Sequence, residues 1–445
     1  MKDRRQETGP ATVAVRPQQA GEVRDRWAWA EPAVWTERML TALESRDNGG
    51  VWFRLVDKVE SLRALRAAWA KVRANRGSGG VDGQTVQQFA QGMEERLTAL
   101  SVALRTGSYQ PLPVRRVYIP KPDGRKRPLG IPAVRDRVVQ TALRNVLEPI
   151  FEQTFCEHSY GFRPGRSAKD ALRRVDGQLK SGYRYVVDAD LKSYFDTIPH
   201  ERLMALVEQR VADGRVLSLV RAYLQQGVME GLREWKPTGG TPQGAVISPL
   251  LANLYLHPLD GLLRDQGYEM TRYADDFVVL CRTEQEAKDA LGVIQQWVEQ
   301  AGLTLHPEKT RIVDTHAPGG FDFLGYHFER GQRWPRRSSL KKFRDAIRDK
   351  THRNNGRSLP VIITDVNRTV RGWYRYFKHS RYWVFRELDG WIRMRLRSIL
   401  RRRRKRRGRG RGSDHQRWPN AFFAANGLYS MLRAHTLESR LACHH

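Results

Sequence analysis

Two runs of strand-forming residues separated by a short polar break around residue 275 predict a β-hairpin. Residues 268–273 and 277–281 are rich in aromatic and β-branched side chains, and only a short break, which carries Asp275 and Asp276, separates the two runs. Such side chains favour strands, and a short polar break between two strands favours a tight turn. Two adjacent carboxylates are therefore expected at the tip of a hairpin.

A second run, residues 183–190, also predicts a strand and ends in acidic residues. Because alternate residues of a strand share a face, Val186, Asp188 and Asp190 are expected on the same side of the sheet. Asp196 follows shortly afterwards in the sequence. The pattern by itself therefore leaves Asp188, Asp190 and Asp196 as alternatives for a role beside the hairpin.

Helices are expected where apolar residues recur every three or four positions. This spacing occurs within residues 62–72, 135–155, 168–179, 250–256 and 284–302. Another hairpin is expected within residues 113–132, because Pro122, Asp123 and Gly124 separate two extended runs. Helices and strands mixed in this way predict an α+β protein.

Charge is distributed unevenly along the 445 residues. The formal net charge is +30, and residues 331–445 carry +24 of it, which leaves only +6 for the first 330 residues. A positive field concentrated at one end indicates a polyanionic partner, and nucleic acid is the expected one. With 40% hydrophobic residues, the chain has enough apolar surface for the cores of two to four domains.

Cysteine usage and hydropathy bound the location of the protein. Cys156, Cys281 and Cys443 are too widely separated for a disulfide framework or a zinc ribbon, which fits a reducing cytoplasm. Residues 1–20 are polar and show no secretory signal, and the longest apolar stretch, 245–256, is too short to span a bilayer. We expect a cytoplasmic protein with no membrane contact, and no obligate protein partner is evident from the sequence.

The paired aspartates indicate a metal site. Neighbouring carboxylates repel each other unless a cation lies between them. With a third carboxylate from the strand at 183–190, Asp275 and Asp276 could hold Mg²⁺, which prefers oxygen ligands. Two such ions about 3.5–4 Å apart support in-line displacement at phosphorus. The alternative is a solvated Asp-Asp turn without a ligand.

The Tyr-Ala-Asp-Asp box at residues 273–276 resembles the central motif of reverse transcriptases. The run at 190–196 and the boxes that follow it resemble the group II intron-encoded reverse transcriptase/maturase family, and the similarity extends over residues 62–378, most of the chain. The resemblance implies that Asp190 joins the two hairpin aspartates in binding two Mg²⁺ ions and in catalysing nucleotidyl transfer from dNTPs. It thereby selects Asp190 from the three alternatives.

Two basic residues are expected to hold the triphosphate of the nucleotide. Lys121 and Arg127 lie on the hairpin at 113–132, where an ammonium group and a guanidinium fork can reach one phosphate ligand. They also match the positions of the triphosphate-binding lysine and arginine of the family. A solvated basic hairpin is the alternative.

Phe195 and Gln243 are expected to contact the nucleotide itself. Phe195 follows the strand by about one turn, so its ring can occupy the space that a ribose 2′-hydroxyl needs and so select deoxynucleotides. A core position for Phe195, or Tyr194 as the selecting ring, are the alternatives. Gln243 lies in the segment that matches the glutamine–glycine box of the family and can donate to the nucleotide or its template base. The adjacent Gly244 is expected to let the backbone approach the substrate.

Basic residues after and between these motifs are expected to bind nucleic acid. Segment 371–377 interleaves arginines with aromatic side chains, which suits stacking and phosphate contact. The densest block, 393–411, is expected to be disordered or a helix end until it binds. The expected nucleic-acid-binding residues are Arg163, Arg166, Lys309, Arg371, Arg375, Lys378, Arg401, Arg402, Arg403, Arg404, Lys405, Arg406 and Arg407.

The resemblance implies a right-hand polymerase, with an antiparallel sheet in the palm, a helical thumb and a basic C-terminal segment. The expected domains are an N-terminal extension (1–60), fingers (61–180), palm (181–330), thumb/maturase domain (331–400) and a basic DNA- and RNA-binding tail (401–445). For the extension, both packing on the body and contact with RNA are open.

The expected function is that of an RNA-directed DNA polymerase that copies intron RNA and acts as a maturase in group II intron splicing and mobility (retrohoming). Its expected partners are the intron RNA and a target DNA or primer. A splicing factor that only binds RNA, or a reverse transcriptase of a diversity-generating or defence element, are the alternatives.

The chain resembles the lineage of this family that lacks the HNH endonuclease domain. Relatives with that domain carry paired Cys-x-x-Cys zinc ligands, whereas Cys443 is the only cysteine after residue 331. We therefore expect that the protein does not cleave its DNA target and takes its primer from a nick or a replication intermediate.

Overall fold

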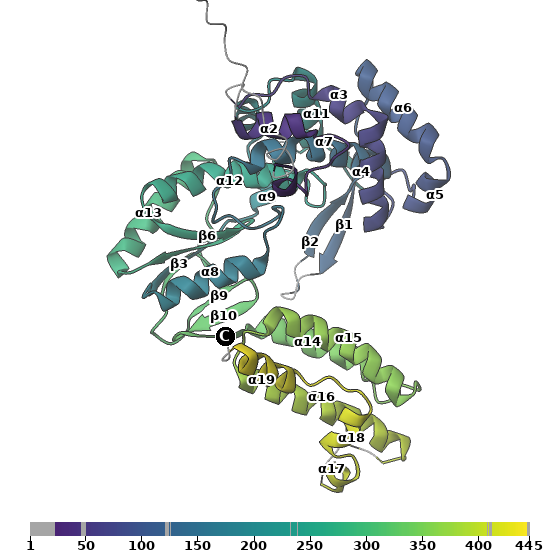
Figure 1. Cartoon of the computed structure of the whole chain (residues 1–445), viewed down its shortest axis with the longest axis vertical. Coiled ribbons are helices and arrows are strands. Elements are labelled where there is room, and N and C mark those ends of the chain that lie inside the picture. Colours follow the sequence, from purple (N-terminus) through teal and green to yellow (C-terminus); the bar gives the residue numbers. More distant parts are fainter. Residues whose placement is uncertain are drawn as a thin grey trace, which may run out of the picture.

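Fingers, palm and thumb can be distinguished in the computed structural model of the chain, and we use the names of the predicted domains for them (Figure 1). The structure describes residues 23–45, 50–120, 124, 126–231, 233–237, 239–406, 408 and 412–442. Within this part of the chain, no helix combines the length and the apolar character needed to cross a bilayer.

The fingers are mainly helical and carry the first predicted hairpin. Their helices are α4 (Leu62–Asn75), α5 (Val86–Gln91), α6 (Met93–Thr106) and α7 (Val134–Glu152), and the N-terminal extension before them contains α2 (Glu37–Ser45) and α3 (Val56–Glu60). The hairpin strands β1 (Val114–Pro120) and β2 (Lys126–Ile131) pair antiparallel, as predicted. Two short strands, β4 (Val228–Glu230) and β5 (Arg233–Trp235), extend this sheet in the order β2-β1-β4-β5.

The described part of the N-terminal extension packs on the body of the protein. Trp35 is 1% exposed, and its indole N–H donates to the backbone oxygen of Asn145 in α7 at 2.9 Å. Trp27 and Leu40 belong to the same buried cluster as the fingers and palm. Of the two alternatives for this extension, packing therefore holds for residues 23–45.

The palm is built around a four-stranded antiparallel sheet. Its strands are β3 (Tyr185–Asp190), β6 (Glu269–Tyr273), β7 (Asp276–Cys281) and β8 (Arg311–Asp314), in the order β6-β7-β3-β8. The helices of this region are α8 (Ala168–Lys180), α9 (Tyr194–Thr197), α10 (His200–Glu208), α11 (Gly214–Leu224), α12 (Ser248–Asp265) and α13 (Glu284–Gln300). The helices predicted at 168–179, 250–256 and 284–302 are thus confirmed.

Both faces of the palm sheet are covered by other elements. Successive side chains of each strand point to opposite faces, so apolar residues are available for packing on each. Val187 and Val279 pack with Ile294 of α13 on one face. On the other face, Val186 and Val278 pack with helix α8 and with a small sheet. The strands of that sheet are β9 (Phe321–Phe323), β10 (Tyr326–Glu329) and β11 (Gln332–Pro335).

The thumb is helical and lies apart from the fingers at the other end of the molecule (Figure 1). Its helices are α14 (Arg337–Lys350), α15 (Leu359–Phe377), α16 (Tyr382–Arg403), α17 (Ser413–Arg417), α18 (Asn420–Ala425) and α19 (Met431–Ala442). Trp418, Phe423 and Met431 are buried in one core with α14–α16. The domain boundary predicted at residue 401 falls inside α16, so the described C-terminal helices are part of the thumb and not a separate tail.

Candidate active site

The predicted hairpin of paired aspartates is present and has a two-residue turn. Tyr273 of β6 is the register partner of Asp276 of β7, so only Ala274 and Asp275 form the turn. Ala274 has a φ of 60° and Asp275 does not have a positive φ, the combination found in type II′ hairpins. Asp276 is therefore the first residue of a strand rather than part of the turn.

Sheet register brings the third predicted carboxylate to this turn. Asp190, the last residue of β3, is the cross-strand partner of Asp276, and such partners have Cα atoms about 4.5–5.5 Å apart. Asp190, Asp275 and Asp276 thus meet at one end of the palm sheet. Asp188 lies one pleat further from the turn, opposite Val278, and its carboxylate is 3.5 Å from the Nε of Arg311. Asp196, which was the other alternative, lies in α9 beyond the end of the strand.

The carboxylates at this end of the sheet raise one another's pKa. Desolvation and then repulsion from Asp188, Asp275 and Asp190 raise the pKa of Asp276 to about 7, although this residue keeps an exposed surface. Desolvation and the charge of Asp190 also raise the pKa of Asp275. Burial raises the pKa of Asp188 to about 6. Carboxylates that resist ionisation in this way are stabilised by a bound cation.

Two of the predicted basic residues lie at the carboxylates. Lys309 forms an ion pair with the carboxylate of Asp190. The segment before β8 runs along the end of β3, where the backbone N–H of His306 donates to the backbone oxygen of Asp190 at 2.7 Å. The charge of Arg127, which lies on strand β2 of the fingers hairpin, lowers the pKa of Asp275. Lys121 lies outside the described residues.

The donor set fits a divalent metal ion. All three candidate ligands are carboxylate oxygens, and oxygen ligands suit Mg²⁺ better than softer metals. A two-metal arrangement needs several oxygens around a shared space. The register places Asp276 opposite Asp190 and next to Asp275, but in the described structure the oxygens of these three carboxylates do not all lie within 4.8 Å of one another.

We expect Asp276→Asn to stabilise the metal-free protein at pH 8. The pKa of this carboxyl is about 7 in the folded chain and near 3.8 ordinarily, so the folded state retains a proton that the unfolded state loses between about pH 4 and 7. Stability therefore falls as the pH rises through this window, and asparagine removes the penalty. Allowing for solvent screening, the gain is on the order of 1 kcal/mol, or about 2 °C in melting temperature.

Thermal unfolding with and without Mg²⁺ measures this effect. Mg²⁺ should raise the melting temperature of the wild type and have little effect on Asp276→Asn. Glu95→Gln in helix α6 removes one acid far from the site and serves as the control. A lower melting temperature for metal-free Asp276→Asn at pH 8 would show that the carboxylates do not repel one another.

Phe195 and Gln243 line one cavity of about 170 Å³ at the junction of fingers and palm. Arg116 of β1 also lines it, and the N–H of Thr241 donates to the backbone oxygen of Phe195 at 2.6 Å. Tyr194 is 2% exposed, and its hydroxyl donates to the oxygen of Ala252 at 2.5 Å. Of the two neighbouring rings, Tyr194 is fully in the core, whereas Phe195 is partly buried, packs against the same core and also lines the cavity.

Gly244 lies where its loop packs closely on the fingers hairpin. Its φ is 106°, and a Cβ at this position would lie 2.6 Å from the backbone oxygen of Gly130 in β2. The N–H of Gly130 donates to the oxygen of Gln243 at 2.7 Å. The glycine therefore permits close contact between the Gln243 loop and the fingers hairpin.

The expectation that Arg163 contacts template phosphates is corrected by its burial. Its guanidinium donates to the carboxylate of Glu152 and to the backbone oxygens of Cys156 and Ser159, and it lies over the ring of Phe155. These contacts engage the group inside the protein. Arg166, three residues further along the chain, is partly exposed.

Most of the predicted basic residues of the thumb face solvent, with local partners for some of them. Lys378 pairs with Glu438 at 3.0 Å and Arg401 with Asp414 at 2.6 Å. Arg407 lies outside the described residues. The exposed members of the set are Arg371, Arg375, Arg402, Arg403, Arg404, Lys405 and Arg406. Block 393–411 is helical up to Arg403, within α16.

The aromatic residues of segment 371–377 pack inside the protein instead of forming a stacking platform. Tyr374 is 2% exposed and Trp373 packs on Phe343 with ring centroids 4.6 Å apart. Phe377 packs on Tyr326 of β10 at 4.9 Å. These rings hold the thumb together and join it to the palm, because helical spacing places them on the apolar face of α15.

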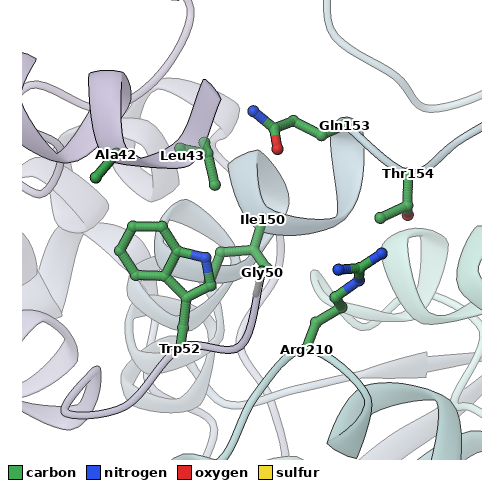
Figure 2. Close-up of a pocket in the computed structure, with 8 residues that line it drawn as sticks. All are labelled: Ala42, Leu43, Gly50, Trp52, Ile150, Gln153, Thr154 and Arg210. Atoms are coloured by element: carbon green, nitrogen blue, oxygen red, sulfur yellow. The ribbon is translucent and has the colours of Figure 1, made fainter. Parts of the chain in front are cut away.

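A second cavity lies between the N-terminal extension and the fingers (Figure 2). The guanidinium of Arg210 lies against Gly50 there, and the volume of about 20 Å³ is too small for a nucleotide. None of the predicted site residues lines it. Its lining residues are Ala42, Leu43, Gly50, Trp52, Ile150, Gln153, Thr154 and Arg210.

Buried polar residues behind the hairpin were not found from the sequence. Arg272 and Asp260 form an ion pair whose side chains are both 0% exposed. The available signal was the presence of an arginine in an otherwise apolar strand and of an acid in an apolar helix. Cys156 and His257 also lie near Asp260, within 4.8 Å, but the carboxylate of Asp260 already accepts from Arg272.

Two known protein families match the sequence of this chain. A family described as reverse transcriptase (RNA-dependent DNA polymerase) matches residues 119–328, and one described as group II intron, maturase-specific domain matches residues 340–418. Among solved structures, telomerase from Candida albicans aligns with a TM-score of 0.40 and 13% identity, over 71% of this chain and 64% of the telomerase chain.

Two curated relatives show the extent of the sequence similarity. Protein YkfC of Escherichia coli (strain K12) is 34% identical over 385 residues, which cover 76% of this chain and 94% of YkfC. The group II intron-encoded protein LtrA of Lactococcus lactis subsp. cremoris is 39% identical over 196 residues, which cover 43% of this chain and 32% of LtrA. The chain thus matches nearly all of one relative and about a third of the other.

Proposed function

The chain belongs to the family of group II intron-encoded reverse transcriptases and maturases, and we propose that it copies its parent intron RNA into DNA during intron mobility. Membership carries the right-hand polymerase fold, RNA-directed DNA polymerase activity that needs a divalent metal, and a maturase function that involves RNA. The main support for the proposed site is the cross-strand pairing of Asp190 with Asp276, beside Asp275 in the turn.

In the proposed reaction, the 3′-oxygen of a primer attacks the α-phosphorus of a dNTP that is paired with the RNA template. The bond from the α-phosphorus to the bridging oxygen breaks, and pyrophosphate leaves. Asp190, Asp275 and Asp276 would hold two Mg²⁺ ions, which activate the attacking hydroxyl and stabilise the leaving oxygens. Arg127 and Lys121 would hold the triphosphate through charge-assisted hydrogen bonds.

The proposed maturase activity depends on binding and not on bond chemistry. Residues 331–445 carry +24 of the net charge of +30, and the exposed arginines of α15 and the end of α16 are part of this field. We propose that this surface binds the parent intron RNA, stabilises its splicing-competent fold, and contacts the target DNA or primer. A cytoplasmic location, as expected from the cysteine usage, is part of the same proposal.

We expect the basic end of α16 to make a measurable share of the RNA contacts. The triple variant Arg402→Gln, Lys405→Gln, Arg406→Gln removes three exposed charges. If each contacts a phosphate of single-stranded RNA, the slope of log affinity against log salt concentration should become shallower by about 2. Filter binding of intron RNA at several salt concentrations measures this slope.

The matched control removes three charges elsewhere. Arg66, Lys180 and Lys288 lie on fingers and palm helices and pair with Glu94, Asp176 and Glu284. Their triple replacement by glutamine should leave the slope unchanged. Equal effects of the two triple variants would mean that the net charge, and not the thumb surface, sets RNA affinity.

Primer extension and splicing assays with the purified protein test the proposal as a whole. The protein should extend a DNA primer on an RNA template in the presence of Mg²⁺ and dNTPs. It should also accelerate splicing of the group II intron whose RNA flanks its reading frame. Failure to extend any primer under these conditions would contradict the polymerase assignment.

A further inference from the structure

A buried arginine lies directly behind the turn that carries Asp275. Arg272 is the second-last residue of β6, and its guanidinium donates from Nη1 to the backbone oxygen of Ala274 at 2.9 Å. That oxygen belongs to the peptide bond between Ala274 and Asp275, so the contact fixes the plane of the peptide from which Asp275 projects. Ala274 has a φ of 60°, a conformation that alanine rarely adopts unless its surroundings hold it.

Two residues of helix α12 hold this guanidinium in turn. Asp260 accepts from Nε of Arg272 at 2.7 Å and also from Nη2, which makes a two-point contact. Asn253 accepts from Nη1 at 2.9 Å. Asn253 and Asp260 are seven residues apart, so they lie on the same face of the helix, two turns from each other. Helix α12 packs beside β6, which brings this face to Arg272.

The same network also reaches the glycine-containing loop of residues 158–161. Asn253 donates from Nδ2 to the oxygen of Gly161 at 2.7 Å. A Cβ on Gly161 would lie 2.3 Å from the nitrogen of Ala274, so this loop is in direct contact with the turn. The N–H of Tyr160 donates to the oxygen of Arg272 at 2.8 Å. The turn is therefore supported from behind by α12 and from one side by this loop.

We propose that Arg272, Asp260 and Asn253 are positioning residues that set the direction of the Asp275 carboxylate. They do not touch substrate or metal in this arrangement, because the ion pair is fully buried. A planar guanidinium can hold the carboxylate, the amide oxygen and the turn oxygen at fixed angles at the same time. The inference rests on the proposed role of Asp275 as a metal ligand.

The geometry separates this role from simple stabilisation of the core. A buried ion pair is weak evidence for stability, because desolvation offsets most of the attraction between the two charges. Misplacing a metal ligand by about 1 Å is costly for catalysis, and loss of groups that orient metal ligands typically reduces metal affinity or activity about 10–100-fold. Loss of the network should therefore change the response to Mg²⁺ and not only the melting temperature.

Primer extension by Asp260→Asn over a range of Mg²⁺ concentrations tests the proposal. We expect kcat to fall about 10–100-fold and the Mg²⁺ concentration for half-maximal rate to rise, with KM for the template–primer unchanged. Arg272→Lys should behave in the same way, because an ammonium keeps the charge and loses the fork. The rise in melting temperature caused by Mg²⁺ should also shrink in both variants, which gives a readout independent of activity.

Two further variants keep the experiment decisive. Asn253→Ala leaves the ion pair intact and should show a smaller change in the same direction, so it decides the question if Asp260→Asn does not fold. Asp213→Asn is the control. The buried carboxylate of Asp213 accepts from the N–H groups of Leu55 and Val56, away from the palm hairpin, so this variant should change only the melting temperature.

The positioning role would be overturned if Asp260→Asn and Asn253→Ala both kept the Mg²⁺ dependence of the wild type. In that case they would only lower the melting temperature, as Asp213→Asn does. Absence of primer extension by the wild type would instead contradict the proposed function. In that case the Mg²⁺-induced change in melting temperature alone would decide whether the network orders a metal site.

Discussion

Replacing Asp276 with asparagine is expected to lower primer extension on an RNA template by about 10³-fold or more and to leave RNA affinity unchanged. The carboxylate stands opposite Asp190 in the sheet and next to the turn carrying Asp275, so its loss removes one of the three residues that would hold the metal ions. A loss of 10³-fold corresponds to about 4 kcal/mol of transition-state stabilisation. Single-turnover extension and filter binding of the same RNA measure the two quantities.

Asp188→Asn is the matched control for this variant. Asp188 lies on the same strand as Asp190 and also has a raised pKa, but it stands opposite Val278 and beside Arg311. We expect a loss of less than about 10-fold, because this carboxylate is not opposite Asp276. If the two variants lose activity equally, the assignment of ligands from the register is wrong.

The same variant separates the polymerase from the splicing function. Asp276→Asn should still assist intron splicing, because the exposed thumb surface is unchanged, and should abolish intron mobility in cells. Wild-type mobility of the Asp276→Asn intron would show that DNA synthesis by this site is not what the intron uses.

Replacing Phe195 with valine is expected to increase incorporation of ribonucleotides relative to deoxynucleotides by about 10²-fold. The ring lines the cavity that also holds Gln243, and the hydrogen bond from Thr241 to its backbone oxygen fixes its position. Removing the ring opens the space that a 2′-hydroxyl requires, so discrimination by exclusion is lost. Incorporation of one rNTP or dNTP opposite the same template base, compared as kcat/KM ratios, measures this change.

Tyr194→Phe is the control for the neighbouring ring. It removes the hydroxyl that donates to Ala252 and keeps the buried ring, so it should cost about 1 kcal/mol of stability and leave nucleotide selection unchanged. If Phe195→Val slows both nucleotides equally, Phe195 is a packing residue and the alternative stated from the sequence holds.

Several features of the candidate site were predictable because they depend on neighbouring residues. The hairpin of Asp275 and Asp276 follows from two runs of strand-forming residues around a short break, and its turn needs no distant partner. The amphipathic helices follow from the spacing of their apolar residues. Local pattern also placed Asp188 and Asp190 on one face of a strand, and it left the choice between them open.

The resemblance selected Asp190, but the residue pattern could not, because the cross-strand partner of Asp276 depends on the register between distant strands. The partner of Asp276 is Asp190 because β3 and β7 pair with Ala189 opposite Phe277, and a shift of one residue would move each side chain to the other face. The burial of Tyr194 likewise depends on a distant segment, because its hydroxyl donates to the backbone oxygen of Ala252 in helix α12. The neighbouring Phe195 lines the cavity instead.

The sequence by itself determined the carboxylate hairpin, the basic C-terminal part and the resemblance to intron-encoded polymerases, because each lies in contiguous residues or in composition. Only the tertiary structure decided which charged residues are available to a ligand. Arg163 and Arg272 are buried by partners from other segments, whereas Arg402 and Arg406 remain exposed. Burial depends on what the rest of the chain packs against a side chain, and the residue type alone does not contain that information.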